Sequence, residues 1–462
     1  MLTPFDPWHT GLVAAEVGMA SIASPEVLAA LRARRLAALF EAAAQGSPRY
    51  RRLFAGRDPA LTRLEELPIA RKSELMRHFT DWVTDPAISL DHLRRFVADP
   101  GNIARACLDR YIVWESSGSS GEPAIFVQDA QAMGVYDALE ALRRPVLRPL
   151  QRWLDPWGLT ERIAFVGATG GHFASNVSVE RMRQLQPGLS SRLRGLSFLQ
   201  PLKALGAELE AFQPTVLATY PSAAVLLAQE HIAGRLQVDL REIWTGGEGM
   251  SSVQRAFVQD SFSCPVSQSY GASEFLSLAF ECQHGMLHLN SDWAILEAVD
   301  TQGRPVPDGH AGSTTLLTNL ANHVQPLIRY DLGDRVSLQS TPCVCGSHLP
   351  VITVCGRDDD TLQLRGGRGR ARVDVVPLAV STVLEDAGLF DFQLVQNGPG
   401  ELLLTTGMHG RQAQHTLDAA RQQLGDFLRE QGAQGVHIQC RSGVKARCGR
   451  SGKLQRVIVS PH

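Results

Sequence analysis

The stretch WESSGSSGEPAIF, residues 114–126, places four serines and two glycines between two apolar segments. Glycine lets the backbone N–H groups of a loop converge, and serine adds hydroxyl donors without charge. Because the chain returns at once to an apolar run at 124–127, the pattern predicts a loop held between two strands. Such a loop suits an anion such as phosphate. Taken alone, the pattern is also typical of plain turns, and it lacks the Gly-Lys-Ser/Thr ending of a Walker loop.

The segments around this loop alternate in the manner of a layered α/β protein. Short apolar runs at 163–171, 215–219 and 242–244 predict buried strands, and the first and last of them lead into glycines. Apolar residues at helical spacing predict helices at 24–54 and 226–231. In such folds, ligands bind at the carboxyl ends of the strands.

The second half of the chain has a different pattern. Antiparallel sheet is predicted by short strands separated by Asp, Gly and Pro, at 293–299, 313–317 and 335–338. Near Gly356, GRDDDTLQLRGGRGRAR concentrates charge and glycine, and about one hundred residues of mixed strand and helix pattern follow it. We therefore expect a large α/β domain with layered sheets, helices and a β-rich part over residues 1–355. A small α+β domain is expected over residues 356–462.

Composition limits the partners of this protein. The 462 residues carry a net charge of −2, with 44% hydrophobic and 20% charged residues. The absence of a basic excess argues against a nucleic-acid groove or a polybasic membrane patch, so a small-molecule partner is expected. The sequence shows neither a signal-peptide pattern nor a membrane-spanning apolar run, which predicts a soluble cytoplasmic protein. Eight cysteines in such a chain are expected to be thiols or metal ligands.

Five further motifs follow the serine-glycine loop: GGEGM at 246–250, SYGASE at 269–274, PLIRYDLGD at 326–334, GRDDDTLQLRG at 356–366 and SGKLQRV at 451–457. In this order the six motifs resemble those of the adenylate-forming superfamily, the acyl-CoA synthetases and their relatives. Within it, the chain is most similar to the phenylacetate-CoA ligase family. That family's N-terminal pattern resembles LFEAAAQGSPRYRRLF and LEELPIARKSEL, and its cysteine-bearing insert resembles ECQHGMLH and CVCG. The resemblance runs from about residue 35 to 458.

The resemblance implies an enzyme that joins a carboxylate to the α-phosphorus of ATP, releases pyrophosphate, and passes the acyl group to the thiol of CoA. Because both reactants of the first step are anions, the site needs cations and hydrogen-bond donors. ATP, Mg²⁺ and CoA are the implied cofactors and co-substrates. The implied acid is aromatic, but phenylacetate, benzoates, hydroxylated or amino-substituted aryl acids and some non-aromatic acids stay open. A homodimer also stays open.

The same resemblance implies a nucleotide site built from the motifs. A loop that would wrap the β- and γ-phosphates consists of Ser116, Ser117, Gly118, Ser119, Ser120 and Gly121. The adenosine would be bound by residues of the later motifs: Gly247 and Glu248 beside the adenine, Tyr270 with Gly271 and Ser273 against it, Asp334 at the ribose hydroxyls, and Arg357 supporting the sugar.

Three residues carry catalytic or conformational roles by resemblance. Glu274 would help to hold Mg²⁺, which prefers carboxylate and phosphate oxygens. Lys453 would span the carboxylate and the α-phosphate and so stabilise the transition state. Asp359 matches the hinge about which the small domain of these enzymes rotates. Outside this pattern, Glu274 would be taken for a solvated carboxylate, Asp334 for a turn residue and Lys453 for a replaceable surface lysine.

The acyl pocket is implied between FVGATGGHFASN, ATYPS and the SYGASE loop, with a lining of His172, Phe173, Tyr220, Pro221 and Ala272. The sequence departs from the family at Glu122, where relatives usually carry lysine, and in a longer, more basic passage after Arg365. Two alternatives therefore stay open. One is delivery of the acyl group to a carrier-protein thiol or an amine. The other is an inactive nucleotide-binding relative, which Glu122 favours and the motif residues disfavour.

A cysteine cluster offers a metal site. Cys282-x5-His288 and Cys343-x-Cys345 supply three thiolates and one imidazole, a complete set for tetrahedral structural zinc. Ordinary buried thiols are the alternative, and rival ligands are His284, His348 and Cys355. Such a zinc would clamp two loops and take no part in catalysis.

Overall fold

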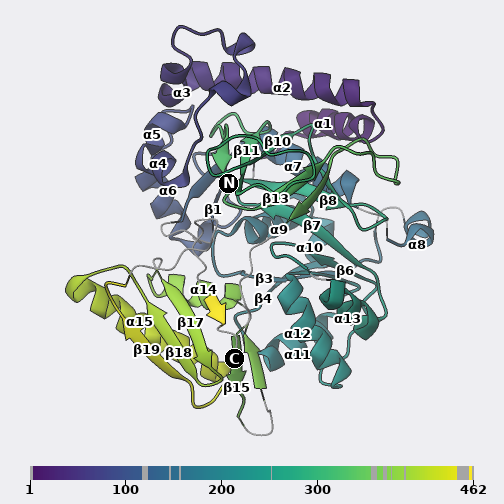
Figure 1. The fold of residues 1–462 in the computed structure, drawn as a ribbon. Coiled ribbons are helices and arrows are strands. Elements are labelled where there is room, and N and C mark those ends of the chain that lie inside the picture. Colours follow the sequence, from purple (N-terminus) through teal and green to yellow (C-terminus); the bar gives the residue numbers. More distant parts are fainter. Residues whose placement is uncertain are drawn as a thin grey trace.

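The computed structural model describes residues 4–116, 123–144, 147–155, 158–250, 252–354, 362–367, 372–375, 377–389, 392–444 and 457–459. Its largest element is a nine-stranded mixed sheet with the strand order β13-β14-β9-β8-β7-β6-β5-β3-β4, flanked by helices (Figure 1). No helix among these residues is long and apolar enough to span a bilayer.

Helices lead the chain: α1 (Pro7–Ala20), α2 (Pro25–Gly46), α3 (Pro48–Leu53), α4 (Lys72–Arg77), α5 (Phe79–Trp82) and α6 (Leu90–Val97), with 3₁₀ turns at Pro59–Leu61, Leu64–Glu66 and Pro100–Asn102. The predicted helical stretch 24–54 is confirmed as α2 and α3. It is interrupted at Pro48, which has no backbone N–H to continue α2. Side-chain caps begin several helices, as where Asp6 accepts the N–H of His9 (3.0 Å) at the start of α1.

One half of the large sheet is parallel. It consists of β3 (Ile163–Gly167), β4 (Leu193–Ser197), β5 (Val216–Thr219), β6 (Glu242–Thr245) and β7 (Val266–Ala272). The helices that precede or connect these strands are α7 (Ala130–Arg143), α8 (Pro149–Leu154), α9 (Ala174–Leu185), α10 (Pro187–Ser190), α11 (Leu202–Phe212), α12 (Pro221–Ile232) and α13 (Ser252–Phe262). The three predicted buried strands and the predicted helix at 226–231 are confirmed.

The other half of the sheet is antiparallel: β8 (Phe275–Glu281), β9 (Leu287–Leu289), β14 (Val351–Val354) and β13 (Val336–Gln339). Beside it lie a three-stranded sheet of β10 (Ala294–Val299), β11 (Thr314–Asn319) and β12 (Tyr330–Asp331), and the hairpin of β1 (Ile112–Glu115) and β2 (Ile125–Gln128). The change to antiparallel sheet after residue 285 is therefore confirmed.

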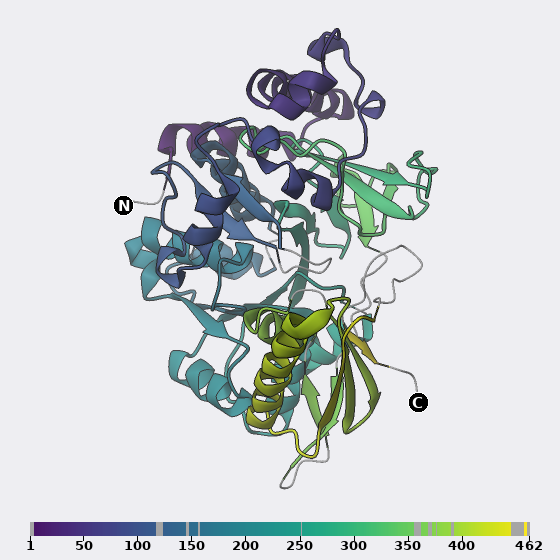
Figure 2. The same ribbon diagram turned by 90° about the vertical axis from the view of Figure 1, so that its left-hand side faces the viewer.

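The C-terminal part is a small α+β unit. It contains the pair β15 (Leu362–Arg365) and β16 (Arg372–Val375), then α14 (Pro377–Asp386) and α15 (Gly410–Glu430). A four-stranded sheet has the order β19 (His437–Arg441), β18 (Glu401–Thr405), β17 (Gln393–Gly398) and β20 (Val457–Val459). Helix α15 packs through a helically spaced stripe that includes Leu417, Leu424 and Phe427, and Figure 2 shows it alongside the strands.

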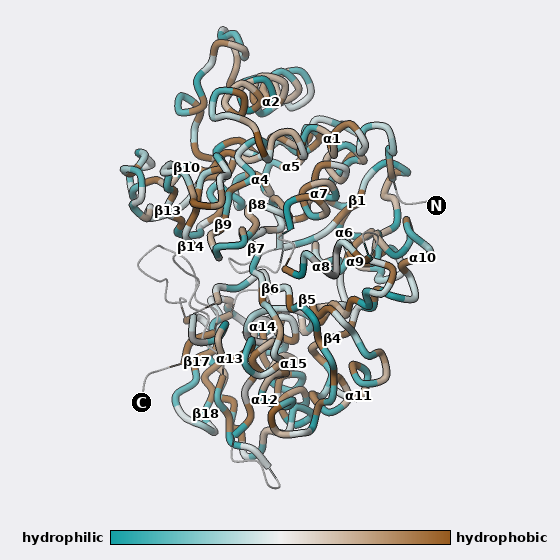
Figure 3. Tube along the Cα trace, turned by 90° about the vertical axis from the view of Figure 1, so that its right-hand side faces the viewer, coloured by the Kyte–Doolittle hydropathy of each residue, from teal (hydrophilic) through white to brown (hydrophobic). Residues whose placement is uncertain are grey.

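Two buried cores hold these parts together. One joins the N-terminal helices, the β1–β2 hairpin and the antiparallel strands. The other runs from the parallel half, including Leu205 and Leu227, into the C-terminal part at Val373 and Phe427. In Figure 3 the C-terminal strands lie below the large sheet, next to α12. The predicted domain boundary, between residues 355 and 356, lies outside the described residues, and its position stays a prediction.

Candidate active site

Several predicted site residues follow the carboxyl ends of parallel strands. His172 and Phe173 lie in the loop after β3, Tyr220 follows β5, and Gly247 follows β6. In an open α/β sheet, this edge is where ligands bind. Gly247 has a positive φ of 78°, and a Cβ there would lie 2.9 Å from the Tyr220 ring. A larger residue at position 247 would therefore displace this ring.

The serine-glycine loop connects β1 to β2, as predicted. The backbone N–H of Ser116 donates to the carbonyl of Ala124 (2.8 Å). The N–H of Ala124 in turn donates to Oγ of Ser116 (3.0 Å). These bonds fix where the loop leaves and re-enters the fold. The predicted phosphate-binding residues 117–121 and Glu122 lie outside the described residues.

The SYGASE motif forms the turn between β7 and β8. Ala272 pairs with Phe275, so Ser273 and Glu274 are the two turn residues. Gly271 lies where a Cβ would come within 1.9 Å of the Leu276 carbonyl oxygen, which explains glycine at this position. Asn319 donates to the carbonyl of Glu274 (2.9 Å), and this bond helps to fix the turn.

The Glu274 carboxylate is half-buried and lies among polar groups. Its Oε1 accepts a hydrogen bond from the hydroxyl of Tyr330 (2.9 Å). Burial raises the pKa of Glu274, the negative charge of Asp334 adds to the rise, and the Tyr330 bond and the Lys72 charge oppose it. Glu274 therefore lies within electrostatic reach of both Lys72 and Asp334.

Asp334 and Tyr270 are joined directly. The Tyr270 hydroxyl donates to Oδ2 of Asp334 (2.7 Å), although 64 residues separate them in sequence. Asp334 follows Gly333, which has a positive φ of 67° and donates its N–H to Oδ1 of Asp331 (2.9 Å). The RYDLGD motif is thus a turn, and the turn directs Asp334 to the aromatic residue of the other motif.

Lys72 is a site residue that the sequence analysis missed. Its Nζ donates to Oγ of Ser116 (3.3 Å), at the start of the serine-glycine loop. Its backbone is positioned by Ala70, which accepts the N–H of Asp331 and donates to the carbonyl of Arg329 (both 2.9 Å). The available sequence signal was the lysine in the LEELPIARKSEL pattern, which had been noted for its family resemblance and given no role in the site.

The remaining nucleotide-site and catalytic predictions lie outside the described residues. They are Arg357, the hinge residue Asp359 and the catalytic lysine Lys453. Glu248 lies in the described part, where its carbonyl accepts a hydrogen bond from Nε2 of Gln268 (3.3 Å). The structure therefore brings together Ser116, Glu274, Tyr270 and Asp334, and adds Lys72. We call these five residues the polar cluster.

The predicted acyl-pocket residues differ in exposure. His172 is fully buried, and its ring meets that of Phe96 edge to face (5.8 Å between centroids). Tyr220 is partly exposed and packs edge to face on Phe198. Burial raises the pKa of Tyr220 to about 12, so its hydroxyl stays protonated. Phe173 and Ala272 are also partly exposed, whereas Pro221 begins α12 and is buried.

Glu115, the last residue of β1, interacts with two other regions. Its N–H donates to the carbonyl of His172 (2.8 Å), which ties β1 to the loop after β3. Burial raises the pKa of Glu115 to about 7, and the charge of Asp386 on α14 adds to the rise. The pKa of Glu115 therefore depends in part on a charged residue of the C-terminal part of the chain.

The four predicted metal ligands come together at the other end of β8. Cys282 follows that strand, His288 lies on β9, and Cys343 and Cys345 lie between β13 and β14. Their ligand atoms all lie within 4.8 Å of one another. His284 and His348 are not part of this group, and Cys355 lies outside the described residues.

The surroundings of the cluster suit thiolate ligands. Backbone N–H groups donate to sulfur at Cys282, from His284 (3.4 Å), and at Cys345, from Ser347 (3.5 Å). Nδ1 of His288 lies 2.8 Å from the Leu349 carbonyl, while Nε2 lies 3.4 Å from Sγ of Cys345. A proton on Nδ1 would leave Nε2 as the metal-binding nitrogen, the arrangement usual for histidine ligands.

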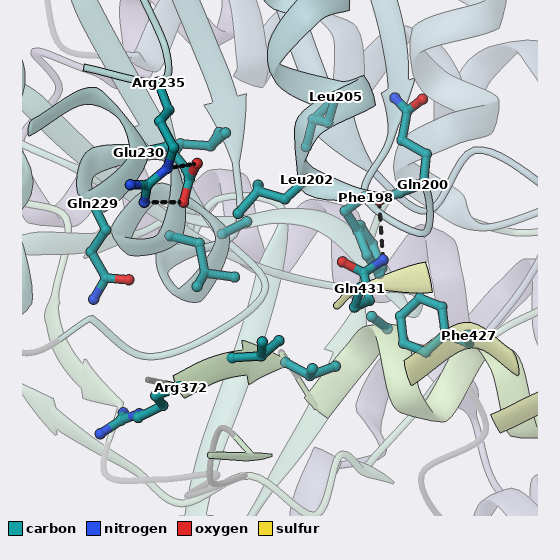
Figure 4. Close-up of a pocket in the computed structure, with 16 residues that line it drawn as sticks. Phe198, Gln200, Leu202, Leu205, Gln229, Glu230, Arg235, Arg372, Phe427 and Gln431 are labelled. Atoms are coloured by element: carbon teal, nitrogen blue, oxygen red, sulfur yellow. Dashed lines mark hydrogen bonds and ion pairs between the residues drawn. The ribbon is translucent and has the colours of Figure 1, made fainter. Parts of the chain in front are cut away.

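A separate pocket of about 380 Å³ lies between the C-terminal part and α11–α12 (Figure 4). Leu202, Leu205 and Phe427 contribute to its apolar wall. The Arg235–Glu230 ion pair (2.8 Å) lies on one side, and on the other Gln431 donates to the Gln200 carbonyl (3.1 Å). None of the predicted site residues in the described part lines this pocket, so it is distinct from the polar cluster.

Comparisons with known proteins confirm the fold. No protein-family model matches the chain. The protein CapK of Staphylococcus aureus is 24% identical over 200 residues, which are 42% of this chain and 42% of CapK, so the match spans less than half of that relative. A solved structure of 2-hydroxyisobutyryl-CoA ligase with 2-HIB-AMP and CoA has a TM-score of 0.57 at 19% identity, covering 96% of this chain and 91% of that one. The same ligase with R3-HIB-AMP has a TM-score of 0.55 at 20% identity and the same coverage. The chain therefore has the layered α/β fold of these CoA ligase structures, including its α+β C-terminal part.

Proposed function

We propose that this protein is an AMP-forming acid–thiol ligase that activates a carboxylic acid, preferably an aromatic one, and transfers it to CoA. The observation that carries the proposal is the polar cluster, in which residues of four distant segments meet in an arrangement that suits a nucleotide. The fold, shared with a ligase solved with an acyl-AMP and CoA, supports the same chemistry.

Each member of the polar cluster has a role in the proposed first step. Asp334 would accept the two ribose hydroxyls, with Tyr270 holding its carboxylate in place and contacting the adenine. Ser116 would donate to phosphate oxygens at the start of the loop. Glu274 supplies the hard oxygen ligand that Mg²⁺ prefers. When bound, Mg²⁺ supplies positive charge that offsets the charge of the phosphates.

Lys72 resolves the difficulty raised by Glu122. The loop lacks the lysine usual in relatives, and a carboxylate beside a triphosphate is repulsive. Lys72 places an ammonium group 3.3 Å from Oγ of Ser116, where the loop begins. We infer that α4 supplies the cation that the loop itself lacks, which weakens the alternative of an inactive nucleotide-binding relative.

The acyl group would lie between the loops that follow β3, β5 and β7. Phe173, Tyr220 and Ala272 are partly exposed there and offer an apolar and aromatic wall suited to a flat acid. His172 is fully buried, so it would support the loop after β3 and would not contact the acyl group itself. The similar ligase structure bears a 2-HIB adenylate, so aliphatic 2-hydroxy acids belong in any substrate panel.

The C-terminal part would complete the reaction. Lys453 would contact both the carboxylate and the α-phosphate, and Arg357 would support the ribose. Rotation about Asp359 would then exchange this arrangement for a thioester-forming one. The chain would work in the cytoplasm, where ATP and CoA are supplied. Transfer to a carrier-protein thiol or an amine remains the second candidate, because the longer, more basic passage after Arg365 departs from the family pattern in the part expected to shape the thioester-forming arrangement.

We also propose that Cys282, His288, Cys343 and Cys345 hold a structural zinc. Three thiolates and one imidazole are a closed tetrahedral set. For zinc–ligand bonds of about 2.0–2.3 Å, the ligand atoms of such a set lie roughly 3.5–3.8 Å apart. In the structure the four ligand atoms all lie within 4.8 Å of one another, and the Cys345 Sγ–His288 Nε2 distance is 3.4 Å. The zinc would join the loop after β8 to the loop before β14.

The proposed function is tested by exchange of labelled pyrophosphate into ATP, run over a panel of aryl and 2-hydroxy acids. We expect exchange that depends on the acid and is abolished by Lys453→Ala while ATP still binds. Full exchange in that variant, or no exchange with any acid, would overturn the proposal. Offering free CoA and a carrier protein as acceptors then separates the two candidate second steps.

A further inference from the structure

Helix α1 is apolar on two opposite faces. One face, with Val13, Val17 and Ala20, is buried and packs against α7. The other face is exposed, and Figure 3 shows α1 at the edge of the molecule, beside α7. A second apolar face on a helix is normally covered by other protein or by lipid. In the described part of this chain, nothing encloses the second face.

The exposed face has a regular pattern. Its large residues are Trp8, Leu12 and Met19 on the helix and Ile22 in the turn directly after it, which are 85, 70, 63 and 88% exposed. Together with exposed Ala15 they are spaced at intervals of four, three, four and three residues. This spacing keeps side chains in one stripe along a helix and is the pattern by which helices pair. We call these five residues the α1 stripe.

Two glycines lie on the same side of the helix. Gly11 and Gly18 are exposed, and a Cβ at either position would meet no atom within 4 Å. Glycine in a helix interior weakens the helix relative to alanine. The chain's own packing gives no reason for these two residues, whereas the close approach of a second helix does.

The face carries no net charge that would attract a charged partner. Glu16 is the acidic residue of α1, and it is ion-paired within the chain to Arg35 (2.6 Å) and Arg34 (3.1 Å). A helix that binds an anionic membrane surface usually carries lysine or arginine, and α1 has neither. The fitting partner is therefore another uncharged apolar surface.

The α1 stripe is complementary to itself in the antiparallel direction. If two copies cross at Ala15, residue 12 faces residue 18 of the partner subunit, and residue 19 faces residue 11. Leu12 and Met19 thus each meet a glycine, so large side chains enter the gaps left by small ones. At each end, Trp8 lies next to the turn that follows the partner subunit's helix.

The exposed area is sufficient for a specific pair. Phe5 before the helix and Val27 after it are 45 and 50% exposed and extend the apolar surface. At about 150 Å² for a large apolar side chain, these two residues and the four large residues of the stripe present roughly 600 Å². A symmetric pair would bury about 1,200 Å², which is the lower end of specific protein interfaces.

We propose that the α1 stripe binds the α1 stripe of a second copy of this chain, antiparallel, about a two-fold axis that passes near Ala15. Such an interface is isologous and closes as a dimer. It leaves the polar cluster and the Cys/His cluster untouched.

Sedimentation of the full-length protein over a range of concentrations tests the pairing. The wild-type chain should sediment at twice its monomer mass, and Leu12→Glu should weaken association by at least about 100-fold with an unchanged circular dichroism spectrum. Ile232→Glu is the matched control, since Ile232 is also an exposed helical residue, and it should remain dimeric. A monomeric wild type, or a dimeric Leu12→Glu variant, would overturn the proposal.

Cysteine cross-linking tests the antiparallel arrangement. Ala15→Cys should form disulfide-linked dimers under mild oxidation, with the wild-type chain and its native cysteines as the blank. Trp8→Cys should not link, because the two copies of residue 8 would lie about 21 Å apart along the helix axis. Equal linkage of both variants would indicate a parallel pair and contradict the proposal. If the monomer instead binds phosphatidylcholine or anionic vesicles, and Leu12→Glu loses this binding, the partner of the α1 stripe is a membrane surface and the proposal is wrong.

Discussion

Strand β8 has a cluster of functional groups at each end, and the two clusters differ in what their groups already bind. At the Phe275 end, oxygen and nitrogen atoms form pairs with one another, such as Tyr270 with Asp334 (2.7 Å) and Lys72 with Ser116 (3.3 Å). At the Glu281 end, three sulfurs and one imidazole nitrogen face a common centre.

On the proposed function, the Phe275 end would bind substrates and the Glu281 end would have a structural role. Hydrogen bonds between half-buried polar groups can be exchanged for bonds to a ligand at small cost. Thiolates that face one another have no good partner except a metal, and a metal bound by four protein ligands is closed to substrate. Changes in the polar cluster should therefore reduce the rate and spare the fold, and changes in the Cys/His cluster should do the reverse.

The largest effect is expected at Glu274. Glu274→Gln keeps the shape of the side chain and removes the charge proposed to hold Mg²⁺, so pyrophosphate exchange should fall by about 10²–10³-fold. Thermal unfolding should be unchanged or slightly improved, because a half-buried charge is removed. Glu242→Gln, at the amino end of β6, should keep wild-type exchange. Wild-type pyrophosphate exchange in Glu274→Gln would contradict a catalytic role for the polar cluster.

Loss of a sulfur ligand should act on stability. Cys345→Ser is expected to lower bound zinc well below one atom per chain and to destabilise the fold by roughly 3 kcal/mol. Metal analysis and thermal unfolding measure the two effects. Cys440→Ser, a change at a half-buried cysteine on β19 outside the cluster, should alter neither. Full zinc content in Cys345→Ser would show that these side chains do not form the metal site.

A smaller effect is expected at Lys72. Lys72→Ala should lower kcat/KM for ATP by roughly 10–100-fold, since it removes one cation near the phosphates. Lys203→Ala, on the exposed side of α11, is the matched control. Adding Glu122→Lys to the Lys72→Ala variant should restore part of the loss. If the double variant is no better than Lys72→Ala, the two positions do not share a role.

The smallest effect concerns pH. The pKa of Glu115 is raised from 4.5 to about 7, mainly by burial. Between these values the folded chain holds a proton that the unfolded chain has lost, so stability falls as pH rises through this window. Glu115→Gln should therefore raise Tm by a few degrees at about pH 8 and leave it unchanged at about pH 4. A gain that is equal at both pH values would contradict the raised pKa, and exposed Glu401→Gln should show no difference.

Motif order predicted much of the polar cluster. Glu274, Tyr270 and Asp334 could be grouped from the sequence because each lies in a short motif, and the structure brings them together. Lys72 was missed because its position depends on the pairing of Ala70 with residues 329–331, a contact between segments about 260 residues apart. Hydrophobic periodicity reports on local segments and carries no information on contacts between distant ones.

Other features also needed three-dimensional information. The sequence placed a domain boundary near Gly356, but it did not show that Val373 and Phe427 share a core with α11 and α12. Similarly, the apolar residues of α1 are visible in the sequence, yet exposure distinguishes the face with Leu12 from the face with Val13. The grouping of Cys282, His288, Cys343 and Cys345 could be predicted because cysteine and histidine spacing is itself a strong pattern, and the structure brings their ligand atoms within 4.8 Å of one another. Their binding of zinc stays a prediction.

The central claim is that an acyl adenylate binds at the polar cluster. It is tested most directly by the affinity of a non-hydrolysable acyl-sulfamoyl adenosine for the wild-type protein and for Asp334→Ala, measured by calorimetry. The account predicts binding by the wild type and at least tenfold weaker binding by the variant, because the ribose would lose a charge-assisted hydrogen bond of about 1.5–3 kcal/mol. Equal affinity of the two proteins would contradict it.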